Sequence, residues 1–140
     1  MIHPALHPAE AGEKTMMKYQ ELTHQVINAA YQVHKVLGYG FLEKVYQNAL
    51  MVELAKRGIR AEKERPLKIH YESEVVGDYV CDIVVEEKVI LELKAVKEIK
   101  DIHEVQLVNY LKGTGIEVGL LINFGPSVQI KRKVLDATRT

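Results

Sequence analysis

The segment KVILELKAV, residues 88–96, places two charged side chains inside a strongly apolar stretch. Its apolar residues predict a buried strand, yet Glu92 and Lys94 stand in the middle of it. A buried carboxylate and a buried ammonium are costly unless they are paired, hydrogen-bonded or bound to a metal. Because strand residues two positions apart point to the same face, both charges are predicted to face one site.

A further acid, Asp82, lies in the preceding apolar run, VVGDYVCDIVV. If the connecting loop has an odd number of residues centred on Glu87, Asp82 lies opposite Glu92, with Cβ atoms roughly 4.5–5.5 Å apart. A two-residue loop would instead place Asp82 opposite Leu91 and separate the acids. Two carboxylates at such a distance repel, and one becomes neutral unless a divalent cation lies between them.

An Asp and a Glu, with or without a backbone carbonyl, form a hard oxygen site that suits Mg²⁺ or Mn²⁺. Such a metal polarises a phosphodiester and activates water. A lysine beside it orients the attacking water or offsets charge on the phosphate. The three residues therefore predict phosphodiester hydrolysis. The competing interpretation is a structural pair of Glu92 and Lys94, with Asp82 in solvent.

The hydrophobic pattern predicts a mixed sheet flanked by helices. Helical spacing predicts helices at about residues 19–37, 41–57 and 101–112. Glycines are expected to end them at Gly38 and Gly40, at Gly58, and at Gly113 and Gly115. Apolar or alternating runs predict strands at residues 66–73, 75–85, 88–96, 117–125 and 127–135. The order is α-α-β-β-β-α-β-β, an α/β (α+β) fold, in which the second and third strands form a largely buried hairpin.

Composition fits one soluble domain of 140 residues, with 47% hydrophobic and 27% charged residues. Nineteen acids balance nineteen bases, which argues against a polybasic binder and leaves a local basic groove open. Residues 1–16 are predicted to be a flexible N-terminal tail, and residues 17–140 a single domain. With one cysteine, no membrane-spanning run and no signal-peptide apolar region, a cytoplasmic setting is expected.

Three motifs resemble those of known nucleases. Asp82 followed by Glu92-Leu93-Lys94 resembles the PD-(D/E)XK nuclease signature, whose core is an α-β-β-β-α-β unit. QLVNY, residues 106–110, is similar to the QxxxY element of RecB-like nucleases in that superfamily. GFLEKVY, residues 40–46, matches the element that gives the GxxExxY protein family its name. The resemblance covers about residues 17–135.

The resemblance implies Mg²⁺-dependent (or Mn²⁺-dependent) cleavage of DNA. It implies metal ligands and catalytic or site-lining residues at Asp82, Glu92, Glu43, Lys94, Gln106 and Tyr110. Tyr46, three residues after Glu43, is expected to face the same way. The alternatives are a non-catalytic module that binds nucleic acid or protein, and a subunit active only in a larger complex. Nucleic acid is the expected partner, with a homodimer left open.

Basic residues elsewhere offer a weaker signal. IKRK, residues 130–133, together with Lys97, Lys100 and Lys112, has the chemistry to contact a phosphate backbone. An alternating edge strand with solvated lysines has the same pattern, and it is the favoured interpretation. His103, one turn before Gln106, is expected to be a surface histidine.

Overall fold

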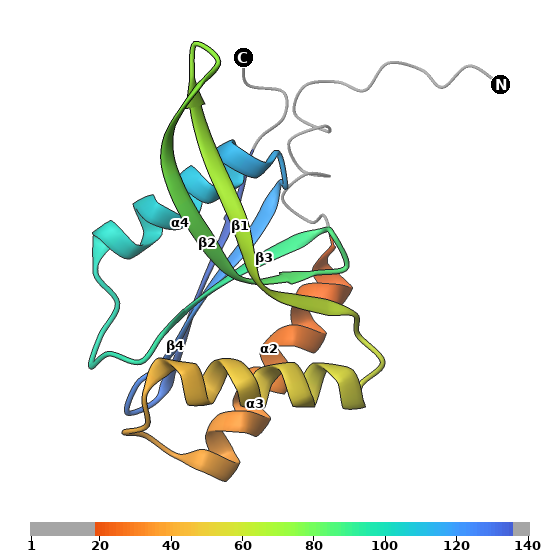
Figure 1. The fold of residues 1–140 in the computed structure, drawn as a ribbon. Coiled ribbons are helices and arrows are strands. Elements are labelled where there is room, and N and C mark those ends of the chain that lie inside the picture. Colours follow the sequence, from red (N-terminus) through yellow and green to blue (C-terminus); the bar gives the residue numbers. More distant parts are fainter. Residues whose placement is uncertain (1–18, 136–140) are drawn as a thin grey trace, which may run out of the picture.

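The computed structural model describes residues 19–135, and in this part of the chain it confirms the predicted element order (Figure 1). The helices are α2 (Gln20–Leu37), α3 (Glu43–Lys56) and α4 (Asp101–Thr114). The strands are β1 (Ala61–Tyr71), β2 (Glu74–Val85), β3 (Val89–Lys94), β4 (Val118–Phe124) and β5 (Val128–Val134). The predicted tail, residues 1–16, lies outside the described residues. No helix among those described is long and apolar enough to cross a membrane.

The strands form one sheet in the order β1-β2-β3-β4-β5. Neighbouring strands are antiparallel except β3 and β4, which are parallel and are joined by α4 as a crossover. Helices α2 and α3 pack on one face of the sheet, and α4 packs on the other (Figure 1). Strand β5 is an edge strand, as predicted.

Strand β3 is covered on both faces, which explains its unbroken apolar run. Leu91 and Leu93 belong to the larger core with α2 and α3, whereas Ile90 belongs to the smaller core under α4. Glu92 shares the face of Ile90 by strand alternation. The charged residues Glu92 and Lys94 therefore lie on a strand of the sheet, which is the layer between helices α2 and α3 on one side and α4 on the other.

Strands β1 and β2 form a long hairpin that extends beyond the helices (Figure 1). The outer half of β2 is exposed, including Val75, Val76, Tyr79 and Val80, and burial begins at Cys81. The prediction that residues 75–85 are largely buried is therefore wrong for this half. The strand continues past the region that helices cover, because it pairs with β1 over its whole length.

Gly113 does not end α4, contrary to the sequence prediction, because the helix continues to Thr114. A Cβ atom at Gly113 would lie 3.1 Å from Cδ1 of Ile69 and 3.3 Å from the methyl groups of Leu67. The glycine therefore permits a close approach of α4 to β1. Gly115 follows the helix with a φ of 77°, in the left-handed conformation expected of a C-terminal glycine.

Candidate active site

The turn between β2 and β3 has the register that brings the two strand acids together. Val85 pairs with Val89, and Ile83 pairs with Leu91, so the loop has three residues centred on Glu87. The next pair in this register is Asp82 and Glu92. Beyond Ile83 the strands separate, and the Leu93 N–H donates to Oδ2 of Asp82 at 2.7 Å. Where β2 and β3 separate, the Asp82 carboxylate thus accepts the hydrogen bond that a backbone carbonyl of the neighbouring strand would otherwise accept.

Glu92 is the most deeply buried acid of the cluster, with 4% of its surface exposed. Its carboxyl group shares a hydrogen bond with Asp82, while its Oε2 is buried without a hydrogen-bond partner. Lys94 follows on the same strand face and is half-buried. A buried carboxylate oxygen without a partner is unfavourable in a metal-free protein.

Glu43 reaches the same place from another element. It begins α3 and lines a cleft of about 720 Å³ together with Asp82, Gln47 and Leu93. The pKa of Glu43 is raised by partial burial and by the negative charge of Asp82, and Lys94 opposes this rise. Three carboxyl groups and one ammonium therefore share the opening of the hairpin.

The electrostatics of this cluster favour a proton or a cation on Glu92. Burial, together with the hydrogen bond and the charge of Asp82, raises the pKa of Glu92 to about 9, and the charge of Lys94 opposes this rise. The donor set, carboxylate oxygens with one oxygen unpartnered, fits a hard divalent ion. Within residues 19–135, however, no group of three His, Cys, Asp or Glu side chains already has the spacing of a metal cage.

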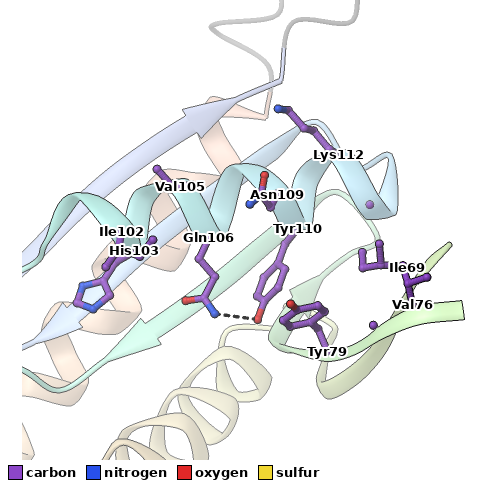
Figure 2. Close-up of a pocket in the computed structure, with 12 residues that line it drawn as sticks. Ile69, Val76, Tyr79, Ile102, His103, Val105, Gln106, Asn109, Tyr110 and Lys112 are labelled. Atoms are coloured by element: carbon purple, nitrogen blue, oxygen red, sulfur yellow. Dashed lines mark hydrogen bonds between the residues drawn. The ribbon is translucent and has the colours of Figure 1, made fainter. Parts of the chain in front are cut away.

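Helix α4 carries Gln106 and Tyr110, whose side chains point toward each other (Figure 2). Nε2 of Gln106 donates to the Tyr110 hydroxyl at 3.3 Å. Burial, with the negative charge of Glu92 adding to it, raises the pKa of Tyr110 to about 12. His103 lies near Lys94: burial and the charges of Lys94 and Lys100 lower its pKa. It is half-buried, and its Nδ1 accepts from the Lys100 N–H at 3.1 Å, so it is more than a solvated surface residue.

A family model described as the PD-(D/E)XK nuclease superfamily matches residues 20–134, which is most of the chain. The chain belongs to the PD-(D/E)XK nuclease superfamily. The crystal structure of SSO0001 has a similar fold, with a TM-score of 0.53 and 21% sequence identity. The match covers 87% of this chain and 62% of that chain. No curated protein matches the sequence.

In this PD-(D/E)XK superfamily member, the structure brings Asp82, Glu92 and Lys94 close to Glu43. Tyr46 does not join them. It is fully buried, and its hydroxyl donates to the Gly38 carbonyl at 2.6 Å and accepts from the Phe41 N–H at 3.3 Å. Its ring stacks on Phe124 with centroids 4.7 Å apart. The expectation that it faces the site is wrong, because the angle between helix positions three apart turns Tyr46 into the core.

Two polar residues that support the site of this superfamily member were missed by the sequence analysis. Buried Gln47, one turn after Glu43, donates from Nε2 to the Asp82 carbonyl at 2.9 Å. Asn123 of β4 is buried, accepts from the Val96 N–H and donates to the Val96 carbonyl, each at 2.9 Å. It therefore clamps the chain just after Lys94. An amide inside the apolar run EVGLLINFG was the available signal for Asn123.

Proposed function

We propose that this chain is an Mg²⁺- or Mn²⁺-dependent nuclease that hydrolyses DNA phosphodiester bonds. The observation that carries the proposal is the buried Glu92 carboxyl, with its unpartnered Oε2, beside Asp82 and Lys94 where β2 and β3 separate. A structural Glu92–Lys94 pair does not account for it, because Asp82 and Glu43 add two more acids at the same place. Membership of a nuclease superfamily supports the reaction class.

Each residue of the cluster has a role in the proposed reaction. Asp82 and Glu92 would hold the cation, and Glu43 would complete the oxygen ligands from α3. When bound, the cation supplies Lewis-acid chemistry to the phosphodiester and to the attacking water. Lys94 donates hydrogen bonds to that water or to the phosphate as its charge increases. The Leu93 N–H and Gln47 hold Asp82 in place through its carboxylate and its carbonyl.

We also infer that the chain belongs to the GxxExxY group within the superfamily, because the motif residues have distinct physical roles. Gly40 has a φ of 116°, which a residue with a side chain rarely adopts. Tyr46 ties the loop at Gly38 and Phe41 to the core. Glu43 starts α3 immediately after this loop and points into the cleft. The glycine and the tyrosine thus position the glutamate.

Cleavage of end-labelled single- and double-stranded DNA, with Mg²⁺, Mn²⁺ or EDTA, tests the proposal. The wild type should cut only with the metal. Lys94→Ala and Asp82→Ala should each reduce the rate by about 100-fold or more, because each removes a group that stabilises charge in the transition state. Lys56→Ala, at the far end of α3, is the matched control and should cut like the wild type. Equal rates in Lys94→Ala and the wild type would refute the assigned site.

A subunit that needs a partner is the second candidate, and the neutral net charge of the chain favours it. Its signature would be Mn²⁺ binding that Asp82→Ala abolishes, together with no cleavage by the isolated chain. A chain that neither binds the metal nor cuts DNA would leave Glu92 and Lys94 as a structural pair.

A further inference from the structure

A second cavity, of about 700 Å³, lies between α4 and the exposed half of the β1–β2 hairpin (Figure 2). Val76 and Tyr79 of β2 line it on one side, and Ile102, Val105 and Gln106 of α4 line it on the other. We call it the hairpin groove. Several of these apolar side chains are strongly exposed, among them Val76 at 61% and Ile102 at 65%. The surface is therefore unusually apolar for a face in contact with water.

Tyr79 is the aromatic platform of the hairpin groove. Its ring is 48% exposed, and the ring centroid lies 5.9 Å from that of Tyr110 at an angle of 59°. A Cβ atom at Gly77 would lie 3.1 Å from Cε2 of Tyr79. The glycine thus leaves room for the ring beside the strand. The ring is held by Tyr110 on one side while much of its surface stays open to the groove (Figure 2).

The hairpin groove lies next to the candidate active site at helix α4. Gln106 and Tyr110 line the groove, and the charge of Glu92 acts on Tyr110. His103 lines one end, and it also lines a smaller neighbouring cavity with Lys97 and Lys100. No acidic residue is among the described residues that line the groove, in contrast to the acidic cleft of Glu43 and Asp82. The described lining of the groove therefore carries no negative charge that would repel a phosphate.

We propose that the hairpin groove receives an unpaired base of a single-stranded nucleic acid, stacked on Tyr79. The adjoining phosphates then pass His103 and Lys100 on the way to the Glu92–Lys94 site. In a duplex each base is already stacked and paired within the helix, so only a single strand or a frayed end presents a free base face. The inference rests on the proposed function and gives its substrate class.

Binding without cleavage tests the groove separately from catalysis. The full chain is titrated in EDTA against a fluorescein-labelled 12-nucleotide single strand and against the same sequence as a blunt duplex. Tyr79→Ala should weaken single-strand binding by about tenfold, the effect of losing one base–aromatic stack. Tyr79→Phe keeps the ring and should bind like the wild type. Tyr71→Ala removes an exposed tyrosine of the same hairpin outside the groove, and it should have no effect.

A strand that carries 2-aminopurine adds a direct signature of stacking. Its fluorescence should be quenched by the wild type and by Tyr79→Phe, and should recover with Tyr79→Ala. Unchanged affinity and quenching in Tyr79→Ala would overturn the inference, even if Lys94-dependent cleavage is found. Self-association that Tyr79→Ala abolishes, without any effect on oligonucleotide affinity, would assign the groove to a second copy and would also overturn it. Loss of binding in Tyr79→Ala by a chain that does not cut would support the groove and refute only the nuclease.

Discussion

Glu92 shows at the residue scale how a candidate metal ligand lowers the stability of the fold. Its carboxyl is buried beside Asp82, one of its oxygens has no partner, and its pKa is raised from 4.5 to about 9. A carboxyl whose pKa is higher in the folded chain than in the unfolded chain favours folding only while it is protonated. In the metal-free protein, its contribution to stability is therefore complete below pH 4.5 and is lost as the pH rises through about 9.

The raised pKa of Glu92 predicts that the effect of Glu92→Gln on stability depends on pH. Glutamine has nearly the same side-chain shape as glutamate but does not ionise. In EDTA, the free energy of unfolding of the wild type should fall between pH 5 and pH 9 by on the order of 5 kcal/mol relative to the variant, as follows from a pKa raised from 4.5 to about 9. Urea denaturation at pH 5, 7 and 9 measures the difference. If the free energy of unfolding changed with pH in the same way in the two proteins, the fold would not raise the pKa of Glu92.

At the scale of elements, the loop between α2 and α3 delivers Glu43 to the cleft. Tyr46 fixes that loop from inside the core through hydrogen bonds to Gly38 and Phe41. Tyr46→Phe keeps the ring stacked on Phe124 but leaves the half-buried Gly38 carbonyl without this donor. It should therefore lower the free energy of unfolding by about 1–2 kcal/mol.

The matched control is Tyr31→Phe, which removes a hydroxyl from a tyrosine that is 52% exposed on α2. It should change the stability by less than about 0.5 kcal/mol. Chemical denaturation at pH 7 compares the three proteins. If Tyr46→Phe is as stable as the wild type, the hydroxyl does not fix the loop, and the explanation of the GxxExxY motif given above is wrong.

At the scale of the whole molecule, the charges balance, so the chain has no large net positive charge to attract a polyanion. The nineteen bases equal the nineteen acids, and Lys133 of the basic run on β5 pairs with Glu104 of α4 at 2.7 Å. The edge position of β5 agrees with the favoured interpretation of that run, but the run is not uniformly solvated, because Lys133 is paired and Nε of Arg132 is buried. Under the proposed function, we therefore expect nucleic-acid affinity to depend more on stacking and on the metal site than on counterion release.

The salt dependence of binding should reflect this balance. The slope of the logarithm of the association constant against the logarithm of salt concentration should be no steeper than about −3 for a single strand, which corresponds to about four neutralised phosphates. Fluorescence anisotropy between 50 and about 300 mM NaCl in EDTA measures it. A much steeper slope would reveal a basic surface that the charge distribution does not indicate.

Much of the fold and the strand part of the site were predictable from local patterns. The period of two placed Glu92 and Lys94 on one face, and the three-residue turn centred on Glu87 was one of two registers open to the sequence. Glycines and apolar periods located the elements to within a few residues. The exception among them, Gly113, is explained by packing, because its missing Cβ permits contact with Leu67 and Ile69.

By itself, the sequence determined the order of the elements and the common face of Glu92 and Lys94, because strand alternation depends on residues that are near in the chain. The register that brings Asp82 opposite Glu92 was one of two open to the sequence, and the structure decided it. Only the tertiary structure decided that Gln47 and Asn123 hold the site, that Tyr46 faces the core, and that Tyr79 stands open in a groove. Those positions depend on which face of a helix meets which part of the sheet. The packing of each helix on the sheet results from contacts between residues far apart in sequence, and the local hydrophobic pattern does not reveal these contacts.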